Sequence, residues 1–127
     1  AVKKNIQKSI SYLSDISERL NTVIIENRDF ESLIRVYDRP TALFYCDPPY
    51  YKSEKYYAAE FKQEDHERLK NCLNVIKGRF ILSYNDDDYI RNLYKDFNIH
   101  EVSRRNSLLE RYDIKNKEYK ELMITNY

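Results

Sequence analysis

A short apolar run that ends in two consecutive prolines constrains this chain more than any other feature. Residues 42–46 read ALFYC and lead directly into Asp47, Pro48, Pro49 and Tyr50. Each proline fixes its own φ and lacks a backbone N–H, so regular hydrogen bonding stops at this point. We therefore predict a strand that ends here and leaves the carboxylate of Asp47 and the carbonyl of Pro48 free to face a ligand.

These groups suit an exocyclic amine on a nucleobase. One carboxylate and one carbonyl can accept both hydrogen bonds of an –NH2 group, because each oxygen carries lone pairs and no proton. The ring of Tyr50 adds a flat face on which a base can stack. The alternative interpretation is a tight turn after a strand, without a ligand.

The chain resembles the Dam-type, or D12, class of N6-adenine-specific DNA methyltransferases, which are common in bacteria and phages. The resemblance implies transfer of a methyl group from S-adenosylmethionine to N6 of an adenine flipped out of double-stranded DNA, in a restriction-modification or phage setting. The similar segments follow the order of the family and include residues 23–30, 43–51, 61–69, 80–86 and 121–127.

The resemblance also assigns roles to single residues. It makes Asp47, Pro48, Pro49 and Tyr50 the catalytic motif, and it places Asp47 against the cofactor as well. The pair of an acid and an aromatic residue at Asp29 and Phe30 matches the family pair that contacts the adenine of S-adenosylmethionine. From the residues alone, Asp29 can equally cap a helix while Phe30 packs in the core.

The low glycine content argues against a complete cofactor-binding turn in this chain. Its one glycine is Gly78, whereas the family carries a glycine-rich turn, roughly FxGxG, that lets the backbone approach the cofactor. The DNA-recognition insertion of the family has no counterpart either. We expect residues 1–127 to form a single domain, the carboxyl-terminal part of a methyltransferase catalytic domain. An active methylase, an inactive remnant and one half of a split enzyme completed by another chain all remain open.

Hydrophobic periodicity predicts an α/β fold in which helices and strands alternate. We expect a partial Rossmann-like class I methyltransferase fold, with a mostly parallel sheet and a terminal antiparallel strand pair. Helices are predicted at 2–20, from 30 to before 40, at 63–77 with Gly78 just after its end, and at 87–95; strands are predicted at 23–25, 42–46, 80–83, 97–102 and 121–125.

Such a partial sheet has an unpaired edge, and unpaired edges seek partners. The first strands of the family fold are absent, so the strand before Asp47 loses the neighbours that they would supply. We predict that this edge drives self-association or is paired by the amino-terminal segment of the chain.

Candidate DNA contacts lie in two polar stretches. In the loop after the motif, Tyr51, Tyr56 and Tyr57 either line the pocket for the flipped base or are ordinary surface tyrosines. A second stretch offers cations for phosphates, although neighbouring acidic residues dilute them, so that a solvated loop is the alternative. These cations are Arg104, Arg105, Arg111, Lys115 and Lys117.

Several other polar residues favour structural roles. His66 reads as a residue at the start of a helix rather than a catalyst, and residues 86–88, all aspartates, read as a helix N-cap rather than a metal site. Residues 83–85 are expected at the same sheet edge as the motif, in the pocket wall. Cys46 and Cys72 lack metal-site spacing and read as buried thiols.

The composition is that of a globular chain. Its 127 residues are 42% hydrophobic and 34% charged, with a net charge of +1, so any attraction to DNA must be local. No run approaches the ~20 apolar residues of a membrane span, and no signal peptide is visible, so the expected setting is the cytoplasm without a membrane partner.

Overall fold

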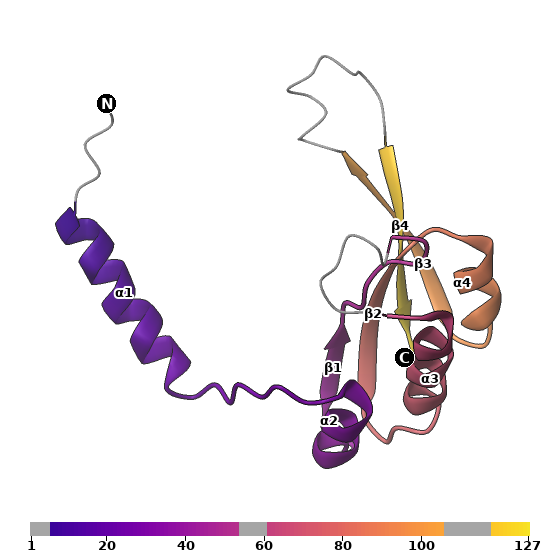
Figure 1. The fold of residues 1–127 in the computed structure, drawn as a ribbon, viewed down its shortest axis with the longest axis horizontal. Helices are drawn as coiled ribbons and strands as arrows, with labels where there is room; N and C mark the ends of the chain where they lie inside the picture. Colours follow the sequence, from indigo (N-terminus) through magenta and orange to yellow (C-terminus); the bar gives the residue numbers. More distant parts are fainter. Residues whose placement is uncertain (1–5, 54–60, 106–117) are drawn as a thin grey trace.

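The computed structural model describes residues 6–53, 61–105 and 118–127. They form four helices and four strands within these ranges (Figure 1). In chain order the elements are α1 (Ile6–Leu20), α2 (Phe30–Tyr37), β1 (Leu43–Cys46), α3 (Gln63–Leu73), β2 (Arg79–Asn85), α4 (Asp88–Leu93), β3 (Asn98–Arg105) and β4 (Glu118–Thr125).

The four strands form one sheet in the order β1-β2-β4-β3. β1 and β2 are parallel, whereas β4 is antiparallel to both β2 and β3. β1, β2 and β3 therefore run in one direction and only β4 is reversed. This arrangement confirms the predicted α/β class, with a mostly parallel sheet and a terminal antiparallel pair, and it shows that β4 is inserted between β2 and β3.

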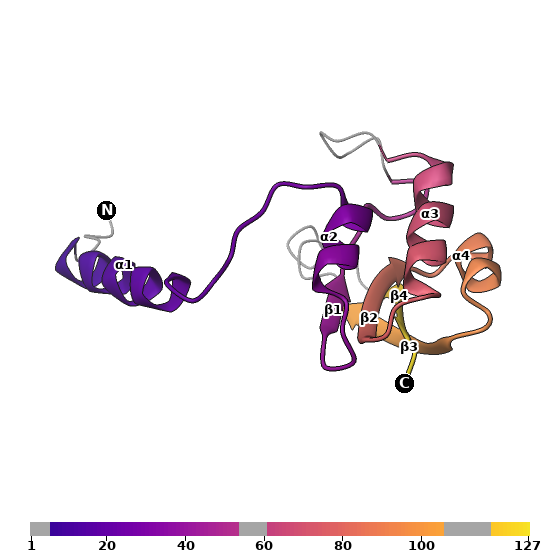
Figure 2. The same ribbon diagram turned by 90° about the horizontal axis from the view of Figure 1, so that it is seen from below.

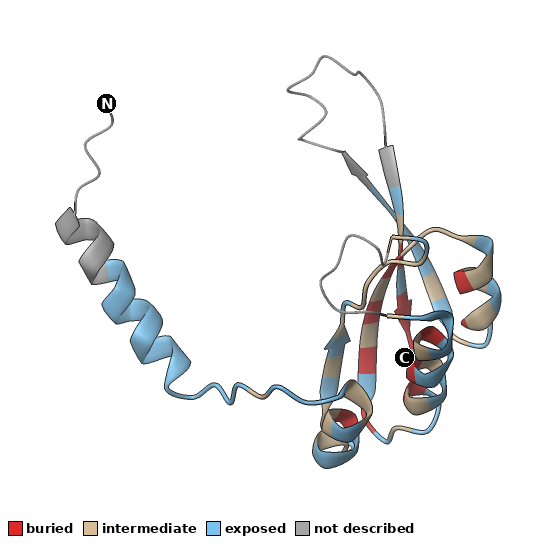
Figure 3. Ribbon diagram, viewed as in Figure 1, coloured by how far each residue is buried: buried red, intermediate tan, exposed pale blue. Residues whose placement is uncertain are grey.

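Helices α2, α3 and α4 cover one face of the sheet (Figure 2). Successive residues of a strand point to opposite faces, and in β2 the alternate residues Phe80, Leu82 and Tyr84 are buried under these helices. Leu122 and Ile124 of β4 continue this layer, which Figure 3 shows as the buried centre of the molecule. None of the described helices covers the other face, whose exposed apolar side chains include Leu43, Tyr45, Val102 and Met123.

The strand predicted at residues 23–25 is wrong. These residues have no regular secondary structure, their side chains are exposed, and they belong to an extended connection between α1 and α2 (Figure 1). A strand needs a neighbour to take its backbone hydrogen bonds, and this connection runs away from the sheet. β1 therefore lies at the edge of the described sheet, and the predicted pairing of that edge by the amino-terminal segment is also wrong.

The predicted helix at residues 2–20 is confirmed from Ile6 onward, and residues 1–5 lie outside the described ranges. α1 stands apart from the sheet and its helices in both views (Figures 1 and 2). Its apolar stripe, which includes Leu13, Ile16 and Leu20, is exposed. An amphipathic helix normally buries such a stripe, so α1 presents a surface that no described part of this chain covers.

The role predicted for Gly78 is also wrong. α3 ends at Leu73, and no glycine in the structure has a positive φ, so Gly78 is not the residue that ends the helix. A β-carbon at Gly78 would lie 2.8 Å from the carbonyl oxygen of Ala42 and 3.0 Å from that of Arg39. Its N–H donates to the carboxylate of Asp38 at 3.0 Å. Glycine is needed here because the chain entering β1 passes so close.

Candidate active site

The motif lies where two parallel strands end side by side. Asp47 directly follows β1, and Cys46 is the register partner of Leu82, so Ser83 of β2 is the neighbour of Asp47. The hydroxyl of Ser83 donates to Oδ1 of Asp47 at 2.7 Å. Carboxyl ends of parallel strands are the usual location of ligand sites in α/β sheets. The catalytic carboxylate predicted from sequence is thus fixed at this edge.

Residues 83–85 lie at the same sheet edge as the motif, as predicted, but they are not among the residues that line the cavity containing Asp47. Besides the Ser83 hydroxyl, Nδ2 of Asn85 donates to the backbone carbonyl of Tyr51 at 3.2 Å. β2 therefore holds the motif on both sides, through Asp47 before the prolines and through Tyr51 after them.

Tyr50 is half-buried against β2. Its ring centroid lies 6.5 Å from that of Tyr84, with the planes tilted by 39°. Burial raises the pKa of Tyr50, the carboxylate of Glu121 raises it further, and a hydrogen bond with Ser83 opposes the shift. Tyr50 is therefore a neutral phenol at physiological pH, which is the state expected of a stacking ring.

One cavity of about 250 Å³ brings together a residue predicted to bind the cofactor and two residues of the predicted catalytic motif. Phe30, at the start of α2, and Asp47 with Pro48, at the end of β1, line it together. Pro49 and Tyr50 are not among its lining residues. Its other walls are mostly apolar and come from Leu33, Ile34, Phe44, Tyr45, Cys46, Phe61 and Leu69.

Asp29 caps α2, so the alternative based on local structure is confirmed. Its Oδ1 accepts from the backbone N–H of Glu31 at 3.0 Å. Its Oδ2 accepts from the guanidinium of Arg68 at 2.6 Å. The side chain is about half exposed, and a carboxylate has lone pairs beyond these two, so capping leaves room for a ligand. Asp29 lines a shallow surface pocket with Glu31, not the cavity that contains Asp47.

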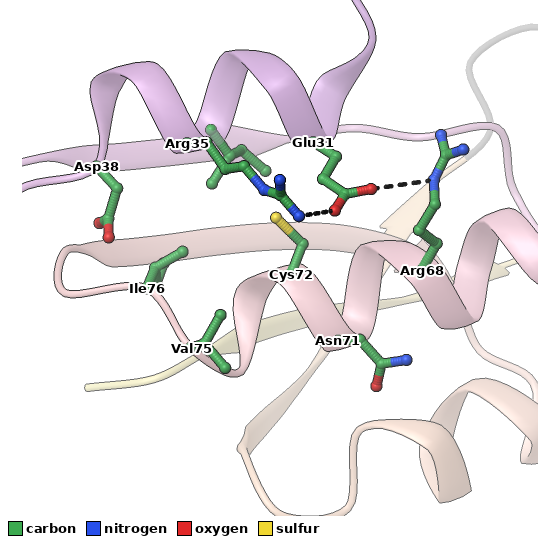
Figure 4. A pocket seen from close by; sticks show the side chains of 9 residues that line it. Glu31, Arg35, Asp38, Arg68, Asn71, Cys72, Val75 and Ile76 are labelled. Carbon is green, nitrogen blue, oxygen red and sulfur yellow. Dashed lines mark hydrogen bonds and ion pairs between the residues drawn. The ribbon is translucent and has the colours of Figure 1, made fainter.

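Sequence reasoning missed Arg68. This α3 residue pairs with Asp29, and its Cζ lies 4.4 Å from the centre of the Phe30 ring. It lines a groove between α2 and α3 where Glu31 also faces Arg35 (Figure 4). Helical spacing relates Arg68 to Asp65 within α3, but no local pattern indicates a contact 39 residues away.

His66 lies near the start of α3, as predicted, but it is also fully buried. Its Nδ1 is 2.6 Å from the hydroxyl oxygen of Tyr84. The rings of Phe61 and Tyr51 stand edge-on to the imidazole, with centroids at 4.8 and 5.5 Å. Tyr51 also stacks on Tyr89 at 4.5 Å. This aromatic cluster packs Tyr51, directly after the motif, against α3 and α4.

The candidate DNA contacts are only partly described. Tyr51 is half-buried in the aromatic cluster, which leaves part of its surface for a partner. Arg104 and Arg105 lie at the end of β3, where the backbone alone is described. Their role in DNA binding stays a prediction. Tyr56, Tyr57, Arg111, Lys115 and Lys117 lie outside the described residues.

The run of three aspartates forms a helix N-terminus, as predicted. Asp87 caps α4 by accepting from the N–H of Tyr89 at 2.9 Å, and it pairs with Lys52 at 2.8 Å. Asp86 takes two hydrogen bonds from Arg91, at 2.6 and 2.9 Å. The hydrogen bond from Arg91 lowers the pKa of Asp86, and that from Lys52 lowers the pKa of Asp87.

Metal and membrane sites are not seen in the described ranges. No group of three His, Cys, Asp or Glu side chains there could hold a metal ion. No helix there has the length and apolar character needed to cross a bilayer. Cys46 and Cys72 are free and half-buried, and burial raises the pKa of Cys46 to about 11, so that it stays a thiol.

Comparison with known proteins identifies the family. The family model for D12 class N6 adenine-specific DNA methyltransferases matches residues 1–108. The chain belongs to this family. Over 136 aligned residues it is 31% identical to the Type II methyltransferase M1.LlaDCHI of Lactococcus lactis subsp. cremoris. That alignment covers 99% of this chain and 45% of the relative, so the chain spans less than half of the relative's length.

The match to the D12 family covers both parts of the candidate site. Asp29 and Phe30 at the start of α2, and Asp47 with Ser83 at the strand ends, all lie within the matched residues. Their roles in cofactor binding and catalysis stay predictions.

Proposed function

We propose that this chain carries the catalytic and adenine-binding part of an N6-adenine DNA methyltransferase that uses S-adenosylmethionine and double-stranded DNA. The observation that supports it best is the shared cavity of Phe30, Asp47 and Pro48 at the carboxyl end of β1. The name of its Lactococcus relative, a Type II methyltransferase, favours a restriction-modification role.

Asp47 and Pro48 would act on the amine of the target adenine. The lone pair of this amine is delocalised into the ring, which makes it a poor nucleophile. Hydrogen bonds from N6–H to the Asp47 carboxylate and the Pro48 carbonyl orient the amine, and the carboxylate stabilises the positive charge that develops on it. The Ser83 hydroxyl holds Asp47 in one orientation for this task. A flipped adenine would stack on Tyr50.

The cavity residues fit the adenosine part of S-adenosylmethionine. Phe30 and Phe61 offer flat apolar faces in the cavity, and Asp29, next to Phe30 in the chain but outside the cavity lining, offers an acceptor for a hydroxyl or amine. When bound, this cofactor supplies an electrophilic methyl group. Pockets for whole ligands usually measure ~300–1,000 Å³, so a volume of about 250 Å³ suits part of the cofactor. Gly78 lies before β2, at the opposite end from Asp47, and supplies no turn for the remainder.

Calorimetry with S-adenosylmethionine tests the cofactor half of this proposal. We expect the wild type to bind with micromolar affinity and Asp29→Ala to lose this binding. The control is Asp96→Ala, which changes an exposed aspartate after α4 and should bind like the wild type. Failure to bind at millimolar cofactor would refute a cofactor site in this chain on its own.

Methylation of adenine-containing duplex DNA, followed by mass spectrometry of N6-methyladenine, tests the catalytic half. Asp47→Asn should reduce the rate by roughly 10²–10³-fold, the typical cost of losing a charge-stabilising group. An unchanged rate in Asp47→Asn would refute the assigned role.

A second candidate function is that of one half of a split methylase, which is inactive alone and is completed by another polypeptide. The open edge of β1 and the exposed stripe of α1 favour it, because both expose surface that a partner could cover. Adding a polypeptide that carries the family's FxGxG turn should then restore cofactor binding. No gain of binding on mixing would argue against the split enzyme and for an inactive remnant.

A further inference from the structure

Arg68 contacts both residues proposed for the adenosine half of the cofactor. Its guanidinium donates to Asp29 at 2.6 Å and lies over the ring of Phe30, with Cζ 4.4 Å from the ring centre. Glu31 and Asp65 flank the same guanidinium at 3.9 and 3.5 Å. One cation of α3 thus holds the acid and the aromatic residue at the start of α2.

Arg68 makes these contacts from outside the cavity. It lines the groove between α2 and α3 (Figure 4), whereas the described walls of the cavity with Asp47 include Phe30 but not Arg68. A ligand in the cavity would therefore meet Phe30 while Arg68 supports the ring from the groove. Arg68 therefore contacts Phe30 without occupying the cavity.

We propose that Arg68 is a positioning residue for the adenosine half of S-adenosylmethionine; this inference rests on the proposed function. A planar guanidinium can stack on a ring and donate to a carboxylate at once, whereas a lysine ammonium is a point charge without a stacking face. Arg68 thereby fixes the Asp29 carboxylate and the Phe30 ring relative to each other before a ligand arrives. Such preorganisation lowers the ordering cost of binding.

Calorimetry of Arg68→Met and Arg68→Lys with S-adenosylmethionine, and with adenosine alone, tests this role. We expect Arg68→Met to weaken both ligands by about tenfold, or about 1.4 kcal/mol, and Arg68→Lys to recover only part of that loss. The matched control is Arg35→Met, which removes a cation that pairs with the same Glu31 in the same groove. Its affinity should equal that of the wild type, and thermal unfolding should show all variants folded.

A double-mutant cycle separates positioning from a general structural effect. Asp29→Asn retains a capping side chain but removes the ionic partner of Arg68. In that background Arg68→Met should weaken binding less than about twofold. An equal loss in both backgrounds, tighter binding of Arg68→Met, or wild-type affinity in Arg68→Met would each overturn this proposal.

These results also separate the two proposals. If the wild type binds, Asp29→Ala does not, and Arg68→Met matches the wild type, the positioning role fails and the cofactor site stands. If neither the wild type nor Arg68→Met binds S-adenosylmethionine or adenosine, both proposals are overturned together.

Discussion

At the residue scale, the contact between His66 and Tyr84 joins α3 to β2 beneath the motif. Both residues are fully buried, and the polar atoms are 2.6 Å apart. Tyr84→Phe removes this hydrogen bond while retaining the ring, so we expect a loss of about 1–3 kcal/mol in the free energy of unfolding. Urea denaturation monitored by circular dichroism measures this loss.

Tyr89→Phe is the control for that experiment. Its hydroxyl donates at 3.2 Å to an exposed glutamate, Glu67, so its loss should change stability by less than about 0.5 kcal/mol. Equal effects of the two substitutions would contradict a special role for the buried pair.

Gly78 yields a second prediction at this scale. The β-carbon of Gly78→Ala would press on the carbonyl oxygens of Ala42 and Arg39, which are backbone atoms and cannot rotate away. We expect a destabilisation of about 1–3 kcal/mol, seen as a lower urea midpoint. The adjacent change Lys77→Ala, at an exposed side chain, should cost little. A neutral Gly78→Ala would mean that the two chain segments can separate freely.

At the scale of the element, the start of α4 should respond to acid. Hydrogen bonds from Arg91 and Lys52 lower the pKa values of Asp86 and Asp87 in the folded chain. Their stabilising effect is complete above the unfolded carboxyl pKa of ~3.9 and is lost as the pH falls through the lowered folded values.

Urea midpoints between pH 7 and pH 3 test this pH dependence. Asp86→Asn should show a smaller fall in stability than the wild type, whereas Asp96→Asn, an exposed aspartate after α4, should follow the wild-type profile. Parallel profiles for wild type and Asp86→Asn would contradict the assignment.

Sequence patterns correctly predicted the elements that depend on residues close together in the chain. Helical spacing of apolar residues found α1 to α4, and two prolines marked the end of β1 with its Asp47. Residues 23–25 have the β-branched composition of a strand, but strand formation depends on a neighbour elsewhere in the chain. The contact of Arg68 with Asp29 is equally nonlocal. Most failures therefore concern contacts between distant segments; the end of α3 at Leu73 rather than before Gly78 is a local failure.

At the scale of the whole molecule, helices cover one face of the sheet, and β1 is an edge strand among the described strands. Leu43 and Tyr45 are exposed there, at 60% and 68% of their surface. We expect concentration-dependent self-association, because exposed apolar edge strands pair with other chains. Sedimentation velocity over a range of concentrations measures it.

Tyr45→Lys should shift that equilibrium toward the monomer, since a charge on an edge strand opposes pairing. Val75→Lys places the same charge on an equally exposed valine in the groove between α2 and α3 and should not shift it. A wild-type chain that stays monomeric at high concentration would contradict this prediction.

The insertion of β4 between β2 and β3 sets an order for amide hydrogen exchange. β3 pairs with β4 alone among the described strands, so β3 loses its ladder whenever β4 unfolds. Backbone amides of β3 can therefore be no more protected through this route than those of β4, while β1 and β2 can remain paired in the same event. The stability of β4 thus sets the upper limit on how strongly the β3 amides are protected from exchange.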